Sequence, residues 1–206
     1  MIISFEHKFV FTAVPKTGTH AVRQALRAHL APGDIEQVGL FVQKKFPIPE
    51  LAALQHGHIS LQQLRPHLRT DQFDGFFKFA FVRNPFDRFV SYCSFMTRFQ
   101  GEFLAAPGRV MAHFLQNPPR QHVLFWPQHS FLADPDGELL TDYVGRVEDM
   151  QQCYDEIAHR IGIPSAQLAK VNSSKRGDYR SYYTPPLVDG VARLYARDLE
   201  LFGYEF

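Results

Sequence analysis

Residues 8–20 read KFVFTAVPKTGTH, and this stretch decides the fold. Its first seven residues are mostly apolar, β-branched or aromatic, which is typical of a buried strand. Pro15 to Thr19 interrupt that pattern. Residues 20–30 then place an apolar side chain at every fourth position, at Val22, Leu26 and Leu30, which predicts a helix. The stretch therefore predicts a strand, a tight loop and a helix in immediate succession.

Residues 76–92, FFKFAFVRNPFDRFVSY, repeat this order. Residues 76–82 are strand formers, Asn84 is a good N-cap, and Pro85 suits the first helical turn. Further patterns predict helices within 51–68, 110–115, 149–161 and 188–202, and a strand at 143–147. Alternating strands and helices indicate an α/β fold. In such sheets ligands bind beyond the carboxyl ends of the strands, where both loops would lie.

Composition sets outer limits on function. The 22 Lys and Arg residues nearly balance the 21 Asp and Glu residues, which excludes a histone-like nucleic-acid coat. Positive charge is concentrated in residues 1–133, so we expect any anion to bind there. No apolar run is long enough to predict a membrane span. Cys93 and Cys153 form no disulfide framework, and Glu6, His7 and Lys8 interrupt any secretion signal, so we expect a cytoplasmic protein.

The first loop is a candidate anion site. Backbone N–H groups at a helix start lack intrahelical partners and favour negative charge. Gly18 allows close approach, Thr17 and Thr19 add hydroxyl donors, and Lys16 adds a positive charge. The pattern G-x-x-x-x-G-K-[ST] is absent because Lys16 precedes the glycine, which disfavours a standard ATP or GTP enzyme.

The second loop supplies a second candidate anion site. Arg83 stands at the predicted strand end, and Ser91 follows two turns into the helix. An arginine there can hold a phosphate by two parallel hydrogen bonds, and an internal salt bridge is the alternative. We expect Arg88 to point outward or to pair with Asp87.

The two motifs together resemble those of sulfotransferases. Residues 15–19, PKTGT, resemble their 5′-phosphosulfate loop, and residues 83–91, RNPFDRFVS, their 3′-phosphate motif. Residues 182–204 resemble the branch that contains carbohydrate sulfotransferases and bacterial relatives. The resemblance implies one sulfotransferase domain over residues 1–206. It also implies a three-layer α/β sandwich with a mainly parallel central sheet and a P-loop-like strand–loop–helix.

The resemblance also implies 3′-phosphoadenosine 5′-phosphosulfate (PAPS) as the donor. Carried over by position, the 5′-phosphosulfate would contact Lys16, Thr17, Gly18, Thr19 and His20. The 3′-phosphate would contact Arg83 and Ser91, and a late loop containing Lys175 and Arg176 would close over the donor. His20 departs from the Thr or Ser that often follows this loop.

Sulfuryl transfer to a hydroxyl calls for a general base with a pKa near neutrality, and histidine meets this need. His56 and His58 flank Gly57, between the two donor motifs. The segment resembles the His-Gly-His stretch of heparan sulfate 2-O-sulfotransferases, which implies His58 as the base and His56 as its helper or an acceptor contact. Surface positions are the alternative for both. Two histidines make a poor zinc site, so we expect no metal.

These observations predict a PAPS-dependent sulfotransferase that acts on an acceptor hydroxyl of a saccharide or glycoconjugate, with Lys16 stabilising the leaving phosphate. We expect no nucleic-acid partner and make no prediction of oligomeric state. One alternative is an ATP-dependent, kinase-like phosphotransferase, although neither loop has an evident magnesium carboxylate. The other is a non-catalytic module that binds a nucleotide or glycan.

Overall fold

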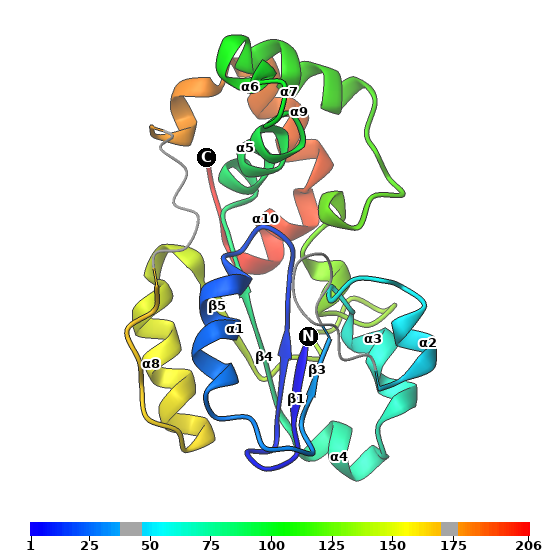
Figure 1. Cartoon of the computed structure of the whole chain (residues 1–206). Helices are drawn as coiled ribbons and strands as arrows, with labels where there is room; N and C mark the ends of the chain where they lie inside the picture. The colour runs from blue at the N-terminus through cyan, green and yellow to red at the C-terminus, as the bar shows by residue number, and fades with distance from the viewer. Residues whose placement is uncertain (38–46, 170–176) are drawn as a thin grey trace. The chain divides into compact units, whose positions relative to one another are not determined.

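The computed structural model describes residues 1–37, 47–169 and 177–206 (Figure 1). The chain divides into two compact units. The first comprises Met1–Val82 and Gln128–Val171, and the second comprises Arg83–Pro127 and Asn172–Phe206. A single domain over residues 1–206 stays a prediction.

A mixed sheet forms the centre of the first unit. Within the described residues it has five strands: β1 (Ile2–Ser4), β2 (Phe9–Thr12), β3 (Ile35–Glu36), β4 (Phe77–Val82) and β5 (Tyr143–Arg146), in the order β3-β1-β2-β4-β5. β2 pairs with β4 and β4 with β5 in parallel, whereas β1 pairs antiparallel with both β2 and β3. The predicted α/β class is confirmed. The expected parallel pairing holds for β2, β4 and β5, and the sheet is mixed because β1 and β3 add antiparallel pairs.

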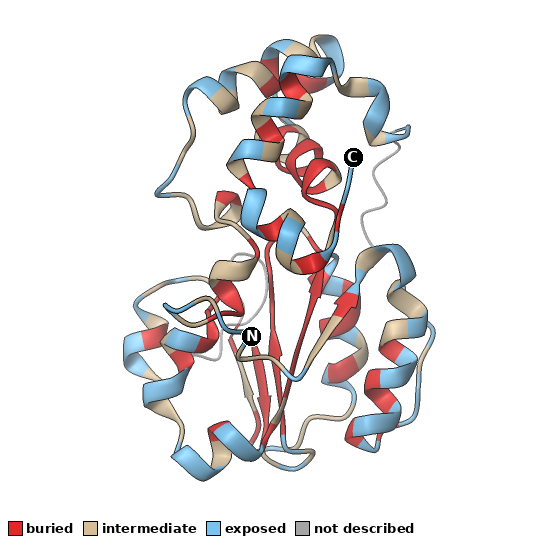
Figure 2. Ribbon diagram, turned by 180° about the vertical axis from the view of Figure 1, so that it is seen from behind, coloured by how far each residue is buried: buried red, intermediate tan, exposed pale blue. Residues whose placement is uncertain are grey.

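Helices cover both faces of this sheet. Alternate strand residues, including Phe9, Phe11, Phe79 and Phe81, pack against α1 (Thr19–Arg27) and α8 (Met150–Ile161). On the other face, Ile3 and Val10 pack with apolar side chains from α2 (Pro49–Ala52), α3 (Leu61–Leu64) and α4 (Thr70–Gly75). This two-residue alternation is the property of a strand that is buried on both faces. The first unit therefore has three layers. Its strands β1, β2 and β4 are almost wholly buried, whereas most residues of β3 and β5 are half-buried or exposed (Figure 2).

Three short 3₁₀ turns complete the first unit: η1 (Arg65–His67), η3 (His129–Phe131) and η4 (Val147–Asp149). The predicted helix at 20–30 is observed as α1, which ends earlier, at Arg27. The predicted helix at 149–161 is α8, which ends at Gly162 in the left-handed conformation that suits a C-cap glycine.

The described residues of the second unit form helices, 3₁₀ turns and loops, with no strand among them. The unit contains α5 (Pro85–Met96), α6 (Glu102–Ala105), α7 (Pro107–Gln116), α9 (Pro185–Leu194), α10 (Ala196–Phe202) and the 3₁₀ turns η2 (Val123–Phe125) and η5 (Tyr179–Tyr182). Its core consists of aromatic and aliphatic side chains, with Phe86, Phe89 and Tyr92 from α5 packed against α7 and α9. The helix expected at 188–202 is interrupted at Tyr195, which separates α9 from α10.

Arg88 is a structural residue of the second unit. It is 2% exposed, and its Nη2 donates hydrogen bonds to the carbonyls of Leu124 at 3.2 Å and Trp126 at 2.7 Å. Its guanidinium also lies over the ring of Tyr195. The expectation that Arg88 points outward or pairs with Asp87 is therefore wrong. The arginine satisfies carbonyls that no local pattern could have associated with it.

Candidate functional site

The loop between β2 and α1 carries two residues in the left-handed conformation. Lys16 has a φ of 67° and Gly18 a φ of 70°. Gly18 is the N-cap of α1, and no side chain hydrogen-bonds to the backbone there as a cap. The positive end of the helix dipole and the N–H groups of its first turn are therefore suited to an anion. The positive φ of Lys16 is uncommon for a residue with a side chain and marks this turn as a specialised one.

The two threonines of the loop have different roles. Thr17 is fully buried, and its Oγ1 donates to the carbonyl of Val14 at 2.9 Å. Its hydroxyl proton is thus engaged within the loop, which leaves the backbone amide as the group that Thr17 offers to a ligand. Thr19 begins α1, and its Oγ1 accepts a hydrogen bond from Arg23 at 3.5 Å.

The pKa of His20 reflects the positive charge around this loop. Partial burial lowers its pKa, and the positive charges of Arg23, Lys16 and Arg27 lower it further. The imidazole is therefore neutral near pH 7. A neutral imidazole can still donate one hydrogen bond to an anion. Three cations that act on one side chain make the start of α1 electropositive.

His58 is tied to the end of β2. Its Nδ1 lies 2.6 Å from the carbonyl oxygen of Ala13, the residue before Val14 in the loop. A carbonyl only accepts, so Nδ1 carries the proton and Nε2 keeps its lone pair. Burial lowers the pKa of His58 to about 3, which keeps the ring neutral. This tautomer is the one that a general base acting through Nε2 requires.

Backbone contacts hold the segment that contains His56 and His58. The main-chain nitrogen of Met1 donates to the carbonyl of Gly57 at 2.6 Å, and Gln37 Nε2 donates to the carbonyl of His56 at 2.9 Å. The two imidazole centroids are 6.2 Å apart. The Nδ1 of His56 is buried with no hydrogen-bond partner among residues 1–37, 47–169 and 177–206, and burial lowers the pKa of this histidine. The two rings are thus neighbours. The His58 ring is fixed by its hydrogen bond to Ala13, and the Nδ1 of His56 is available for a further contact.

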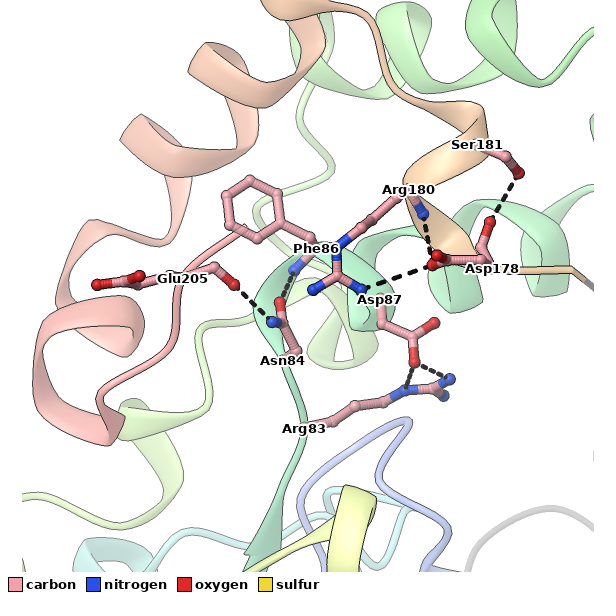
Figure 3. Close-up of polar contacts among 8 residues, drawn as sticks. All are labelled: Arg83, Asn84, Phe86, Asp87, Asp178, Arg180, Ser181 and Glu205. Carbon is pink, nitrogen blue, oxygen red and sulfur yellow. Dashed lines mark hydrogen bonds and ion pairs between the residues drawn. The ribbon is translucent and has the colours of Figure 1, made fainter.

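In the second unit, Arg83 precedes Asn84, the N-cap of α5, and forms an ion pair with Asp87. Its Nε and Nη2 donate to Asp87 Oδ2 at 2.7 and 2.5 Å (Figure 3). The internal salt bridge that the sequence left open is therefore present. Ser91 is 8% exposed and lies one further turn along α5. Asp87 and Ser91 are four residues apart on α5, so they share one side of the helix, and Arg83 pairs with Asp87 from two residues before the helix start.

Asn84 fixes the start of α5 (Figure 3). Its Oδ1 accepts from the N–H of Phe86 at 3.0 Å, and its Nδ2 donates to the carbonyl of Glu205 at 2.8 Å. The N-cap role predicted for Asn84 is confirmed, and the cap also joins α5 to the last residues of the chain. Arg83 is consequently held at a defined point beside the helix start.

The contact between η5 and the start of α5 was not predicted from the sequence. Tyr183 Oη donates to the carbonyl of Phe86 at 2.8 Å, which attaches the end of η5 to α5. Asp178 Oδ1 accepts from the backbone N–H of Arg180 at 3.1 Å and lies 3.7 Å from the Arg180 guanidinium (Figure 3). The sequence offers a charge signal near this segment, because residues 134–206 are acidic overall and Lys170, Lys175, Arg176 and Arg180 cluster within them. Lys175 and Arg176 lie outside the described residues.

No three His, Cys, Asp or Glu side chains gather as metal ligands within the described ranges. In the same part of the chain, no helix is both long and apolar enough to span a membrane.

Comparison with known proteins adds three findings. A model of the Sulfotransferase family matches residues 1–205. An uncharacterized protein of Archaeoglobus fulgidus is 26% identical over 119 residues, which are 57% of this chain and 93% of that protein. A crystal structure of a sulfotransferase from Alicyclobacillus acidocaldarius is 16% identical, with a TM-score of 0.48 over 95% of this chain and 96% of that one.

Proposed function

We propose a specific reaction from the premise that this chain belongs to the Sulfotransferase family. The enzyme transfers the sulfuryl group of PAPS to an acceptor hydroxyl, which a saccharide or glycoconjugate supplies. The observation that carries this proposal is the His58–Ala13 contact of 2.6 Å, which joins a histidine in the base tautomer to the loop of Lys16.

The proposed donor contacts divide between the two motifs. Lys16, the amides of Thr17, Gly18 and Thr19, and the imidazole of His20 hold the 5′-phosphosulfate. The electropositive start of α1 supports this assignment, because helix N-termini and cations favour phosphate groups. Lys175 and Arg176, by resemblance, cover the donor.

Arg83 and Ser91 hold the 3′-phosphate in this proposal. A guanidinium suits a phosphate because it can donate two parallel hydrogen bonds. Asp87 Oδ2 already accepts from both Nε and Nη2 of Arg83, which supports the ability of this guanidinium to hold an anionic oxygen. Donor binding would then exchange one oxygen acceptor for another.

The proposed step is an in-line displacement at sulfur. The acceptor oxygen forms a bond to sulfur while the bond between sulfur and the bridging 5′-phosphate oxygen breaks. The hydroxyl proton passes to His58 Nε2, and the phosphate leaves as adenosine 3′,5′-bisphosphate. Lys16 and the loop amides stabilise the charge that develops on the leaving oxygen. His56 assists His58 or contacts the acceptor.

The low pKa of His58 in the ligand-free protein is compatible with this role. Burial is its main cause, and a phosphosulfate brings negative charge that favours the protonated imidazole. The pKa of His58 therefore rises when the donor binds. The base would gain strength in the complex in which it acts.

Ligand-dependent melting tests this function. The protein is heated with adenosine 3′,5′-bisphosphate, with ATP, or with neither, because a ligand that binds the native state raises the melting temperature. The bisphosphate should stabilise selectively, and transfer from labelled PAPS to a panel of saccharides and small phenols should identify the acceptor. Preference for ATP would instead support a kinase-like enzyme. Binding of the bisphosphate without any transfer would indicate a non-catalytic module.

A further inference from the structure

A buried arginine lies one helical turn after the candidate anion loop. Arg23 is 6% exposed, although it belongs to a nine-residue helix on the surface of the sheet. Side chains of a helix tilt toward its N-terminus, so the guanidinium of Arg23 reaches back to the level of Thr19. Its Nη2 lies 3.5 Å from Thr19 Oγ1. A positive charge is thus buried directly behind the first residue of α1.

Among the described residues, the counter-ion of this charge is a carboxylate that Arg23 shares with Arg27. Glu36 accepts from Arg27 Nε at 2.9 Å and Nη2 at 2.7 Å, whereas Arg23 Nε is 4.0 Å from the same carboxylate. The three side chains therefore carry one surplus positive charge, and it resides mainly on Arg23. The Nε of Arg23 is buried and has no hydrogen-bond partner in the part of the chain that the structure describes. Burying a poorly compensated charge is costly, which indicates that an anion completes this arrangement in the working protein.

The contact with Thr19 has a direction. A guanidinium only donates, so Thr19 Oγ1 is the acceptor and its own proton must point away from Arg23. Thr19 occupies the first position of α1, beside Lys16 and Gly18. An arginine that fills one lone pair therefore orients the hydroxyl as a donor.

The charge of Arg23 also reaches the neighbouring histidines. After burial, it is the largest cause that lowers the pKa of His20, and it adds to the effect of burial on the pKa of His58. Both residues belong to the site proposed above. Arg23 therefore acts on the loop electrostatically as well as through Thr19.

Building on the proposed function, we infer that Arg23 is a positioning residue for the donor's 5′-phosphosulfate. It orients the Thr19 hydroxyl toward a phosphate or sulfate oxygen and supplies the positive charge behind it. The donor thereby meets a second cation in addition to Lys16. The role is specific to the 5′ end of the nucleotide.

Comparing the affinities of two ligands distinguishes this role from a general effect of the substitution on folding. Adenosine 3′,5′-bisphosphate carries the 5′-phosphate, and adenosine 3′-phosphate lacks it. Calorimetric titration should show that Arg23→Gln weakens the bisphosphate about 10-fold or more, the usual scale for a lost hydrogen bond to a charged group. Binding of adenosine 3′-phosphate should change by less than about twofold, since this ligand lacks the 5′-phosphate that the inference assigns to Arg23.

A double-mutant cycle tests the route through Thr19. Thr19→Val should weaken the bisphosphate similarly, and the double variant should lose less than the two single losses combined. Arg23→Lys keeps the charge without the planar fork and should give an intermediate loss. If Arg23→Gln does not fold, Arg23→Lys and Thr19→Val still test the inference.

The outcomes separate the two proposals. If wild-type protein binds both ligands equally, the proposed function fails at the 5′ site. If wild-type protein favours the bisphosphate, the inference on Arg23 is overturned by either of two results. One is an unchanged preference in the Arg23 variants, and the other is an equal loss for both ligands.

Discussion

The Nδ1 of His58 lies 2.6 Å from the carbonyl oxygen of Ala13, so the proposed base is attached to the strand from which the loop of Lys16 begins. The two residues are far apart in the sequence, and the contact fixes both the tautomer and the position of the ring. A base that is fixed in this way can act only through Nε2. This relationship leads directly to the first prediction.

His58→Ala should lower transfer by about 10²–10⁴-fold, the range expected when a general base is removed. The melting-temperature increase with adenosine 3′,5′-bisphosphate should be retained, because His58 is not a proposed donor contact. His113→Ala removes an exposed imidazole from α7 and is the matched control, with no expected loss. Unchanged turnover in His58→Ala would exclude His58 as the base.

The depressed pKa of His58 predicts a dependence of stability on pH. Burial lowers this pKa from 6.5 to about 3, so between these values the unfolded chain binds a proton that the native protein does not. The free energy of unfolding should therefore fall as pH decreases from about 6.5, by at most about 1.4 kcal/mol per pH unit from this group. From about one pH unit above 6.5 the group contributes almost no slope, because the unfolded chain has then also lost this proton.

Urea unfolding between pH 5 and pH 7 measures this effect. His20 and His56 act in the same direction, because burial also lowers their pKa values. The comparison is therefore between wild type and His58→Gln, which keeps a polar side chain and removes the titration. The variant should show the shallower slope, and equal slopes would contradict a depressed pKa at His58.

Arg83→Met should weaken adenosine 3′,5′-bisphosphate by about 10-fold or more and leave adenosine 5′-phosphate nearly unchanged. The reason is that the proposal assigns Arg83 only to the 3′-phosphate, and charged hydrogen bonds have this magnitude. Arg197→Met is the control, since Arg197 lies on α10 and pairs with Glu200 on the exposed surface. Equal weakening of both nucleotides by Arg83→Met would argue against a 3′-phosphate contact.

The two strand–loop–helix stretches were predictable because their signals are local. Residues 8–20 and 76–92 combine strand formers, a turn and a helix start within a few residues, and the structure has β2–α1 and β4–α5 there. β1 and β3 were not predictable in the same way. They have three and two residues, and they are strands only because β2 and one another supply their hydrogen-bond partners.

Side-chain roles at the candidate site were less predictable than the site's position. The candidate status of Lys16, His58 and Arg83 followed from motif and spacing. The tautomer of His58 depends on the carbonyl of Ala13, and the burial of Arg88 depends on the carbonyls of Leu124 and Trp126. Such partners are distant in sequence, so no periodic pattern predicts them.

Arg88→Met tests the structural role of this buried arginine. The substitution removes two hydrogen bonds from a charged donor and leaves two carbonyls without that partner, which should cost about 2–5 kcal/mol of unfolding free energy. Arg109→Met changes an exposed arginine of α7 and should cost less than about 0.5 kcal/mol. Similar values in denaturant unfolding of the two variants would contradict a structural role for Arg88.

Gly18→Ala separates the conformation of the loop from its chemistry. Gly18 has a φ of 70°, and a Cβ there would lie 2.8 Å from the terminal carbon of Met150. The left-handed conformation costs a residue with a side chain about 1–2 kcal/mol, whereas the flexible methionine can move. Gly33→Ala is the matched control, because nothing lies within 4 Å of its Cβ position. We expect Gly18→Ala alone to lower both the free energy of unfolding and the affinity for adenosine 3′,5′-bisphosphate. Wild-type values for both quantities would show that neither this conformation nor a close approach at Gly18 is required.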